Sequence, residues 1–383
     1  MRAAGKASAR RTRARASVLG RDKNGHVAEL ALIAALERSL GVRGDRVMRA
    51  LGDDASVVRA RPVAVTSLDT AVEGVHFRLD THAPGDVGHK ALAAALSDLA
   101  AMGACAGEAY LGLVVPEGLA NDDALALMGA AEALAERTGT TIAGGDVVSG
   151  PALVVSVAVT GWAESPEEVV TRDGAHPGDL VGVTGELGGS GAGLALLDGL
   201  DVPGLDAGAR EALLRRHLRP QPRLAAGRAV AAGGATAMID LSDGIATAAR
   251  HLAERSGVSV ALELDRLPLA AGVEAVADAA GQDPQALAAT AGDDFELLLC
   301  APPQHCGQLE RAVQALDCPL TWIGEVTNGD GVERRDRTGV PTSLAGFEHG
   351  TGGGPKASRS RGDERLSAAR PTAFPQANPA RRS

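Results

Sequence analysis

The chain has 383 residues, a length that allows two domains with sizeable cores, and its formal net charge is −10. The charge is unevenly spread: residues 1–23 carry a net +7 and residues 350–383 a net +5, so the body between them carries −22. Such an acidic body argues against direct nucleic-acid binding by the folded part unless cations intervene, and no apolar run is long enough to span a membrane.

The first half of the body alternates between predicted helices and strands. Folded sequence is expected to begin near Val27, after a basic Arg- and Ala-rich extension (residues 1–26) that we expect to be disordered. We expect one α/β domain over residues 27–165. Apolar spacing and turn residues predict its elements as a helix over 27–41, a strand over 62–68, a helix over 87–103, a strand over 110–116, a helix over 122–139 and strands over 140–145 and 152–162.

The second half continues the alternation and predicts a C-terminal α/β domain over residues 166–349. The predicted elements are a strand over 179–185, a helix over 192–200, two helices within 215–232, a strand over 236–241, a helix over 244–257, a strand over 258–264, helices up to 291, a strand over 295–302, a helix over 308–316 and a strand over 320–326. The tail, residues 350–383, is expected to be disordered, with contact to RNA or an acidic partner as the alternative role of its basic residues.

Four cysteines indicate the redox compartment. Cys105, Cys300, Cys306 and Cys318 form no C-x-x-C pair and have no histidine at zinc-finger spacing. The pattern is typical of reduced, mostly buried thiols, so we expect a cytoplasmic protein.

Aspartates recur in short Gly-, Ser- or Thr-flanked clusters along much of the chain. The clusters are GDDASV from Gly52, TSLDTAVEGVHF from Thr66, LSDLAAMGA from Leu96, GGDVVSG from Gly144, IDLSDG from Ile239 and AGDDFEL from Ala291. Carboxylates in turns and at helix starts are typical ligands of Mg²⁺, a hard cation. If folding gathers these groups, several metal ions would have to neutralise them, and metal-bridged phosphate chemistry is the expected use of such a site.

Asp98 carries the strongest individual signal among these carboxylates. It lies in an otherwise apolar helical segment beside Leu96, Leu99 and Met102, and a buried unpaired charge is costly. The other aspartates also fit structural roles. Asp54 fits a turn, Asp69 a helix cap and Asp243 an N-cap, while Asp240 ends a strand and Asp146 follows two glycines that let a ligand approach the backbone.

Three further features leave a structural and a functional interpretation open. His76 fits a core position or a ligand contact, and Arg172 fits a surface charge or a phosphate contact. The segment GELGGSGAG from Gly185 fits a generic turn or a phosphate-binding loop before a helix. The P-loop signature and the protein-kinase motif set are both absent from the sequence.

Taken in order, these motifs resemble those of the thiamine-monophosphate kinase family, within the AIR-synthetase-like (PurM-like) ATP-binding superfamily. The resemblance covers roughly residues 29–349 and also includes TRDGAHPGD, RHLRPQPR and the closing GFEH. It implies a two-domain PurM-like α/β (α+β) fold, in which the mixed N-terminal sheet joins that of a second copy in a homodimer. It also implies ATP-dependent phosphorylation of thiamine monophosphate to thiamine diphosphate.

The resemblance assigns roles to individual residues. The implied metal ligands are Asp54, Ser67, Leu68 through its carbonyl, Asp69, Asp98, Asp146, Asp240 and Asp243, which would hold several Mg²⁺ ions. Gly145, Asp146, Arg172 and Ser242 would contact ATP, whereas His76, Asp293 and Phe347 would contact the thiamine substrate.

The chain departs from the family pattern at three places. Asp293 stands where the family usually has Glu, Val147 and Val148 follow GGD where Thr is common, and Gly350 stands where relatives commonly finish with Phe. The acceptor would be an anionic phosphate oxygen, so positioning and charge neutralisation are the main requirements, and we expect no covalent phosphoenzyme. The alternatives are a sister ATP-dependent synthetase with another small substrate and a non-catalytic nucleotide- or metal-sensing homologue.

Overall fold

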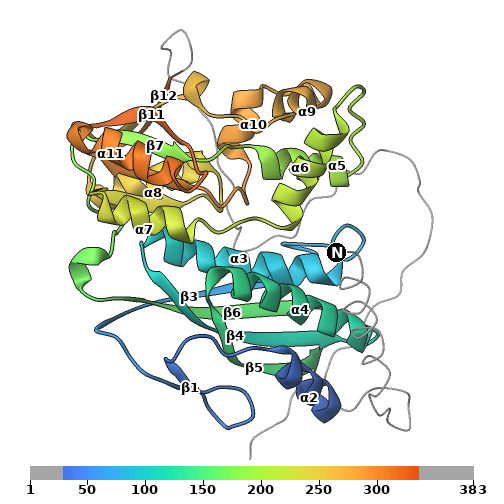
Figure 1. Cartoon of the computed structure of the whole chain (residues 1–383). Coiled ribbons are helices and arrows are strands. Elements are labelled where there is room, and N and C mark those ends of the chain that lie inside the picture. Colours follow the sequence, from blue (N-terminus) through green and yellow to red (C-terminus); the bar gives the residue numbers. More distant parts are fainter. Residues whose placement is uncertain (1–28, 336–383) are drawn as a thin grey trace, which may run out of the picture. The chain divides into compact units, whose positions relative to one another are not determined.

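The structure is a computed structural model that describes residues 29–335, all of which fall in one compact unit. The predicted tails, the predicted start at Val27, Phe347 and the expected end near His349 lie outside these residues. The first half contains, in chain order, α2 (Glu29–Ser39), β1 (Val47–Arg49), β2 (Val57–Val58), β3 (Val63–Val72), α3 (Pro84–Ala101), β4 (Cys105–Pro116), α4 (Asn121–Thr138), β5 (Thr141–Gly150) and β6 (Val154–Ala163) (Figure 1).

Strands β3 to β6 form a mixed four-stranded sheet in the order β3-β6-β4-β5, in which only β4 and β5 run parallel. Burial alternates along β3, as expected for a sheet covered on one face. Asp69 pairs in register with the buried Val157 and so points toward the helix-covered face, whereas Leu68 points the other way and is 68% exposed.

The second half forms a six-stranded sheet in the order β12-β9-β11-β7-β10-β8, antiparallel except for the β12–β9 pair. Its helices pack against the sheet and against each other. The elements are η1 (Pro166–Glu168), β7 (Leu180–Thr184), α5 (Gly189–Leu197), α6 (Ala207–Leu218), α7 (Leu224–Ala232), β8 (Ala237–Asp240), α8 (Ile245–Ser256), β9 (Ser259–Glu263), η2 (Leu264–Arg266), α9 (Val273–Ala280), α10 (Pro284–Thr290), β10 (Leu297–Ala301), α11 (Pro303–Gln314), β11 (Leu320–Thr327) and β12 (Gly331–Arg335).

The predicted fold class is confirmed, and so are the predicted helices and strands within the described residues. The sequence did not indicate the short β1–β2 hairpin or strand β12. The boundary proposed between residues 165 and 166 falls between the two sheets, but one hydrophobic core contains residues from both halves, including Leu96 and Leu297. The two predicted domains therefore share buried contacts, and the division of the body into domains at residues 165 and 166 stays a prediction.

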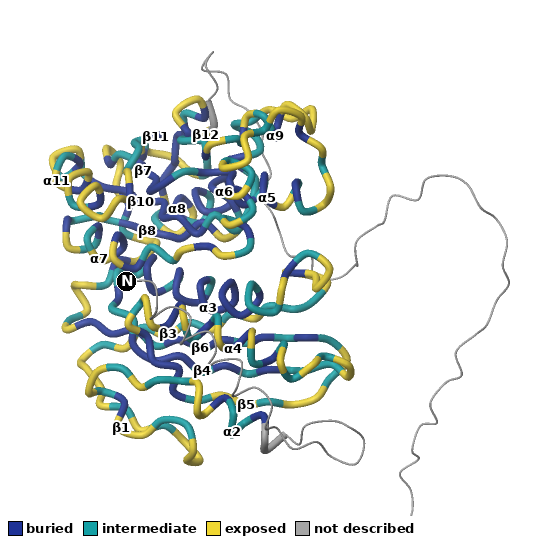
Figure 2. The backbone as a smooth tube through the Cα atoms, turned by 45° about the vertical axis from the view of Figure 1, so that its right-hand side comes forward, coloured by how far each residue is buried: buried dark blue, intermediate teal, exposed yellow. Residues whose placement is uncertain are grey.

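Helix α3 is the most enclosed helix of the shared core (Figure 2). Its neighbours approach closely because glycines stand at the crossings. A Cβ atom on Gly88 would lie 2.0 Å from the Leu127 carbonyl oxygen of α4, and one on Gly227 of α7 would lie 2.0 Å from the Ala100 carbonyl oxygen of α3. Helix α3 is therefore held at fixed positions against both halves.

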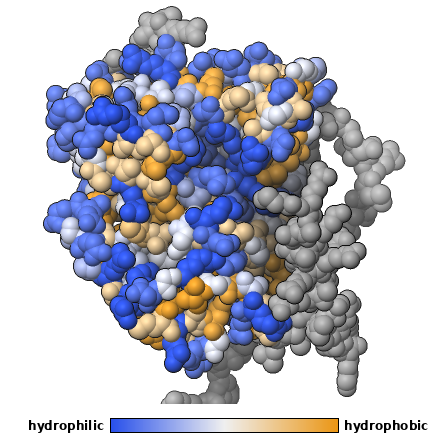
Figure 3. All heavy atoms as spheres, in the orientation of Figure 1, coloured by the Kyte–Doolittle hydropathy of each residue, from blue (hydrophilic) through white to orange (hydrophobic). Residues whose placement is uncertain are grey.

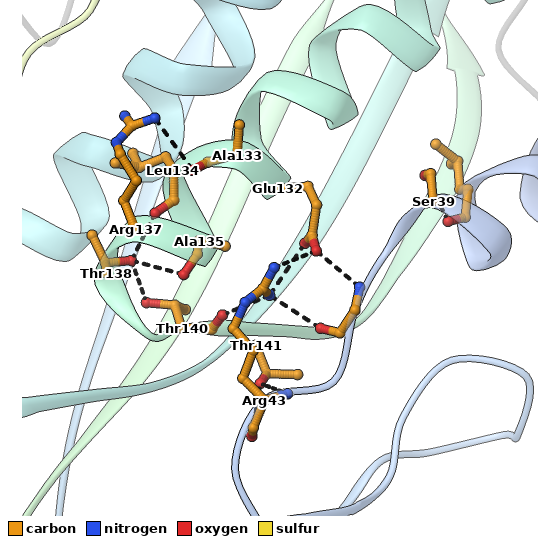
Figure 4. Close-up of polar contacts among 12 residues, drawn as sticks. Ser39, Arg43, Glu132, Ala133, Leu134, Ala135, Arg137, Thr138, Thr140 and Thr141 are labelled. Carbon is orange, nitrogen blue, oxygen red and sulfur yellow. Dashed lines mark hydrogen bonds and ion pairs between the residues drawn. The ribbon is translucent and has the colours of Figure 1, made fainter. Parts of the chain in front are cut away.

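An ion pair fastens the segment before β1 to α4 and β5 (Figure 4). Arg43 lies 2.5 Å from Glu132, and its guanidinium also donates to the Thr140 carbonyl oxygen at 2.9 Å. The Arg43 backbone N–H donates to Thr141 Oγ1 at 2.9 Å. These contacts lie beside β5, at the opposite edge of the sheet from β3.

The surface and the thiols agree with the composition. On the side seen in Figure 3, hydrophobic side chains occur in small groups between hydrophilic ones. All four cysteines are free, and three of them are buried, as predicted. Among residues 29–335, no helix combines the length and apolarity needed to cross a bilayer.

The close crossing of α3 and α7 gives a stability prediction. Gly227→Ala would gain about 1 kcal/mol of helix propensity, but its Cβ would meet the Ala100 carbonyl, so we expect a net loss of about 2–4 kcal/mol. Gly129→Ala in α4 is the matched control, because no atom of another segment within residues 29–335 lies within 4 Å of its Cβ position. Thermal unfolding should show a lower Tm for Gly227→Ala and an unchanged or higher Tm for Gly129→Ala; equal shifts would contradict the close crossing.

Candidate functional site

Four of the predicted carboxylates converge where α3 meets both sheets. Asp69 comes from β3, Asp98 from α3, Asp240 from the end of β8, and Asp243 from the turn that leads into α8. The charges of Asp98 and Asp243 raise the pKa of Asp69, and the charges of Asp98 and Asp69 raise the pKa of Asp240, so these carboxylates lie within electrostatic reach of one another. These four residues are called the aspartate cluster below.

The aspartate cluster is electrostatically unfavourable by itself. Burial, followed by the charge of Asp98 and opposed in part by Arg172, raises the pKa of Asp240 to about 7. Burial and the charges of Asp98 and Asp243 raise the pKa of Asp69 to about 6. Carboxylates of this kind favour a proton or a cation as partner.

Two serines lie beside the aspartate cluster. The Ser67 hydroxyl donates to Asp98, so this predicted ligand is in place next to a carboxylate. The Ser97 hydroxyl lies close enough to Asp240 to lower its pKa somewhat, yet within the described chain no atom reaches Ser97 Oγ in hydrogen-bonding geometry. This buried hydroxyl therefore adds an oxygen beside the carboxylates of the site.

A pocket of about 480 Å³ opens beside Ser67 and Asp98. One part of its wall is apolar, with Leu99, Met102 and Met238, and another part carries the guanidinium groups of Arg172 and Arg255. The pocket therefore joins carboxylates that suit metal ions to arginines that suit phosphate.

The donor set fits Mg²⁺, although no three His, Cys, Asp or Glu side chains of residues 29–335 are grouped closely enough to hold one ion by themselves. Mg²⁺ usually keeps several waters and is bound by one or two carboxylates together with substrate phosphates. Oxygen ligands on Ser67, Asp69, Asp98 and Asp240, with two raised carboxylate pKa values and the buried Ser97 hydroxyl beside them, match that requirement.

Four predicted site residues lie apart from the aspartate cluster within the described chain. Asp54 is exposed in the β1–β2 turn, where its N–H donates to Asp53. Gly145 and Asp146 lie on β5, at the opposite edge of the sheet from β3. His76 is exposed rather than in the core, and its Nδ1 accepts a hydrogen bond from the Val72 N–H at 3.1 Å.

Strand packing explains why glycine stands at position 145, independently of the predicted ligand contact. A Cβ there would lie 2.1 Å from the Leu111 carbonyl oxygen of β4. The pairing of β4 and β5 alone therefore requires glycine at this position.

The Gly-rich segment after β7 forms a turn and does not present free amides to a phosphate group. Asp294 accepts hydrogen bonds from the Gly188 N–H at 2.7 Å and the Ser190 N–H at 3.0 Å. A protein carboxylate thus occupies the start of α5, where a phosphate-binding loop would present its amides to a ligand.

Asp293 lies in a second polar group, formed with Lys90 and His217. Its carboxylate accepts from the Lys90 ammonium at 2.9 Å, and the same ammonium lies 3.4 Å from His217 Nε2. Its own N–H donates to the Ser242 carbonyl oxygen at 2.8 Å, which joins this group to the aspartate cluster.

Sequence reasoning missed Lys90 and Arg255. Lys90 gives the same signal as Asp98, a charge in an apolar helix, and could have been found by that argument. Arg255, in the last turn of α8, looks like any other surface arginine in sequence, and only the fold places it in the pocket wall.

Comparison with known proteins identifies the relatives of this chain. Residues 52–163 match the model of the AIR synthase related protein N-terminal domain, and residues 176–337 match the corresponding C-terminal domain. A thiamine-monophosphate kinase of Mycobacterium tuberculosis is 41% identical over 280 residues, covering 71% of this chain and 81% of the relative.

Solved structures agree. The crystal structure of thiamine-monophosphate kinase from Stenotrophomonas maltophilia K279a matches with a TM-score of 0.72 and 34% identity, covering 80% of this chain and 96% of that one. The structure of AaThiL complexed with AMPPCP and TMP matches with a TM-score of 0.67 and 30% identity, covering 87% of this chain and 100% of that one. The chain therefore belongs to the thiamine-monophosphate kinase family.

Proposed function

We propose that this protein transfers the γ-phosphoryl group of ATP to thiamine monophosphate, giving thiamine diphosphate, with the help of several Mg²⁺ ions. The observation that carries the proposal is the aspartate cluster beside a pocket that Arg172 and Arg255 also line. The relatives named above support the choice of substrate, and the AaThiL complex supports a nucleotide and a phosphate ester as ligands of one such protein.

The residues of this site suit direct transfer between two polyanions. Bound Mg²⁺ would supply positive charge that neutralises the phosphate groups of both substrates. Asp69, Asp98, Asp240 and Asp243, with Ser67, would hold the ions, and the Arg172 guanidinium would bind and orient phosphate. A phosphate monoester is already anionic near neutral pH, so the proposal assigns no strong base and no protein nucleophile to the reaction.

A homodimer is part of the proposal. The face of β3 that carries Leu68 is exposed. Asp146 of β5 lies on the same face of the sheet, because the register through β4 and β6 places it in line with the exposed Thr70 of β3. A second copy placed on this face would cover Leu68 and bring Asp146 into an interface. The remaining ligand contacts stay predictions; they involve Asp54, Leu68, His76, Gly145, Ser242, Asp293 and Phe347. The cytoplasmic location is a prediction as well.

The direct test is a reaction of purified protein with Mg²⁺, ATP and thiamine monophosphate, with the products identified by mass. We expect ATP consumption that depends on thiamine monophosphate and yields thiamine diphosphate. Turnover only with a different small acceptor would favour a sister synthetase, and nucleotide binding without turnover would favour a sensing homologue. A phosphorylated residue trapped during turnover would contradict direct transfer.

Asp240 gives a prediction that separates a metal site from a structural carboxylate. Folding raises the pKa of Asp240 to about 7. Ionised Asp240 therefore lowers the free energy of unfolding of the metal-free protein. The full loss is present above pH 7, and it diminishes as the pH falls toward 4. We therefore expect Asp240→Asn to raise the metal-free Tm at pH 8 by several degrees, with a smaller rise at pH 5. The variant should lose most of the Mg²⁺-induced Tm increase and at least about 100-fold in kcat.

Asp179→Asn is the matched control for this experiment. Asp179 is equally buried but accepts hydrogen bonds from the His176 N–H at 2.9 Å and Thr236 Oγ1 at 2.6 Å. Its replacement should cost about 1–3 kcal/mol of stability, which lowers the Tm, and should leave the Mg²⁺ response unchanged. If Asp240→Asn also lowers the metal-free Tm while its Mg²⁺ response stays normal, the metal assignment of Asp240 fails.

A further inference from the structure

Lys90 is a buried cation in the same helix as Asp98. Its residue is 7% exposed, and it lies two helical turns before Asp98, about 12 Å along the α3 axis. Burying an ammonium group is costly unless it is paired. Its partners, Asp293 and His217, both come from the second half of the chain, so this cation connects α3 to the opposite side of the site.

The hydrogen bonds around Lys90 determine how His217 is protonated. An ammonium group has donors only, so His217 Nε2 accepts from Lys90, and His217 Nδ1 carries the proton and donates to Ser190 Oγ at 2.9 Å. Burial, followed by the charge of Lys90, lowers the pKa of His217 to about 3. His217 is therefore neutral at working pH, and Asp293 supplies the negative charge that faces Lys90.

Asp293 transmits this contact to the aspartate cluster through the backbone. The Asp293 N–H donates to the Ser242 carbonyl oxygen at 2.8 Å, and the Phe295 N–H donates to the Leu241 carbonyl oxygen at 3.0 Å. These two hydrogen bonds couple the position of residues 292–295 to that of the segment that carries Asp240 and Asp243.

The conformation of this turn is strained. Asp293 and Phe295 have φ angles of 64° and 49°, a region that non-glycine residues adopt only when surrounding contacts hold them. The Lys90–Asp293 ion pair is one such contact.

We propose that Lys90 is a positioning residue, which holds the 292–295 turn against α3 and thereby sets the distance between Asp98 and the two carboxylates of the 240–243 segment. The geometry required for Mg²⁺ binding then depends on an ion pair that touches neither metal nor nucleotide. This inference rests on the proposed function, because it assigns Lys90 to the site of that reaction.

The test compares Lys90→Met, Asp293→Asn and the double variant with the wild-type protein. Three quantities are measured: the Tm without metal, the Mg²⁺ concentration at half-maximal Tm increase without substrate, and kcat with the KM for ATP. Lys90→Met should raise the half-maximal Mg²⁺ concentration at least about fivefold and lower kcat at least about tenfold, with a less than threefold change in the KM for ATP.

The other two variants, Asp293→Asn and the double variant, keep the test decisive if Lys90→Met folds poorly. Asp293→Asn should fold, since the Asp293 side chain is 36% exposed, and should weaken the Mg²⁺ response in the same direction. The double variant removes the unpaired carboxylate and should regain Tm without regaining the wild-type Mg²⁺ response. A double variant with both a wild-type Tm and a wild-type Mg²⁺ response would overturn the proposal.

Arg43→Met is the control for loss of an ion pair elsewhere. The Arg43–Glu132 pair (Figure 4) also connects distant segments, at 2.5 Å, but it lies beside β5, at the opposite edge of the sheet from β3, which carries Asp69. Its loss should lower the Tm and leave the Mg²⁺ response and kcat unchanged. The Mg²⁺ response is measured without substrate, so failure of the proposed thiamine-monophosphate kinase activity and failure of the Lys90 proposal give different results.

Discussion

Repulsion between the buried Asp240 carboxylate and its half-buried neighbours is the constraint on which the rest of this site depends. Asp240 is 5% exposed and faces the charges of Asp98 and Asp69, and burial adds to the cost of its ionisation. A fold selected for stability alone would place apolar or hydrogen-bonded groups there, as it does around Asp179. Keeping the carboxylates together is favourable once cations occupy the space between them, which ties the stability of the site to its ligands.

Helix α3 makes this arrangement possible because it belongs to both halves of the described chain. Gly88 and Gly227 let α4 and α7 approach its backbone, so its position has little freedom. Asp98 projects from this fixed helix toward the aspartate cluster, and Lys90 projects toward the turn that carries Asp293. One rigid element therefore presents a carboxylate to the aspartate cluster and an ammonium group to the segment that carries Asp293.

Much of the fold could be predicted from sequence because apolar periodicity reports local structure directly. The helix over 87–103 and the strands on either side of it are found close to the predicted positions. Strand β12 could not be predicted in this way, because Gly331–Arg335 has a polar sequence and is defined by its parallel pairing with β9. Its partner is more than sixty residues away, and no local pattern encodes that contact.

The site could be predicted only in part, for a similar reason. Asp98 was identifiable because a charge in an apolar helix needs a partner, and the same argument applies to Lys90. The segment from Gly185 fitted both a turn and a phosphate-binding loop, and Asp294, over a hundred residues later, decides for the turn by occupying its amides. Gly145 suggested ligand access, yet the Leu111 carbonyl already requires it. The partners that decide each case come from distant segments.

Proton release on Mg²⁺ binding tests the central claim most directly. Calorimetric titration of metal-free protein at pH 6.5, in buffers with different ionisation enthalpies, measures the number of protons displaced. With pKa values of about 7 for Asp240 and about 6 for Asp69, cation binding should release about one proton at pH 6.5 and almost none at pH 8.5. Binding at pH 6.5 without proton release, or the same release from Asp240→Asn, would contradict the account.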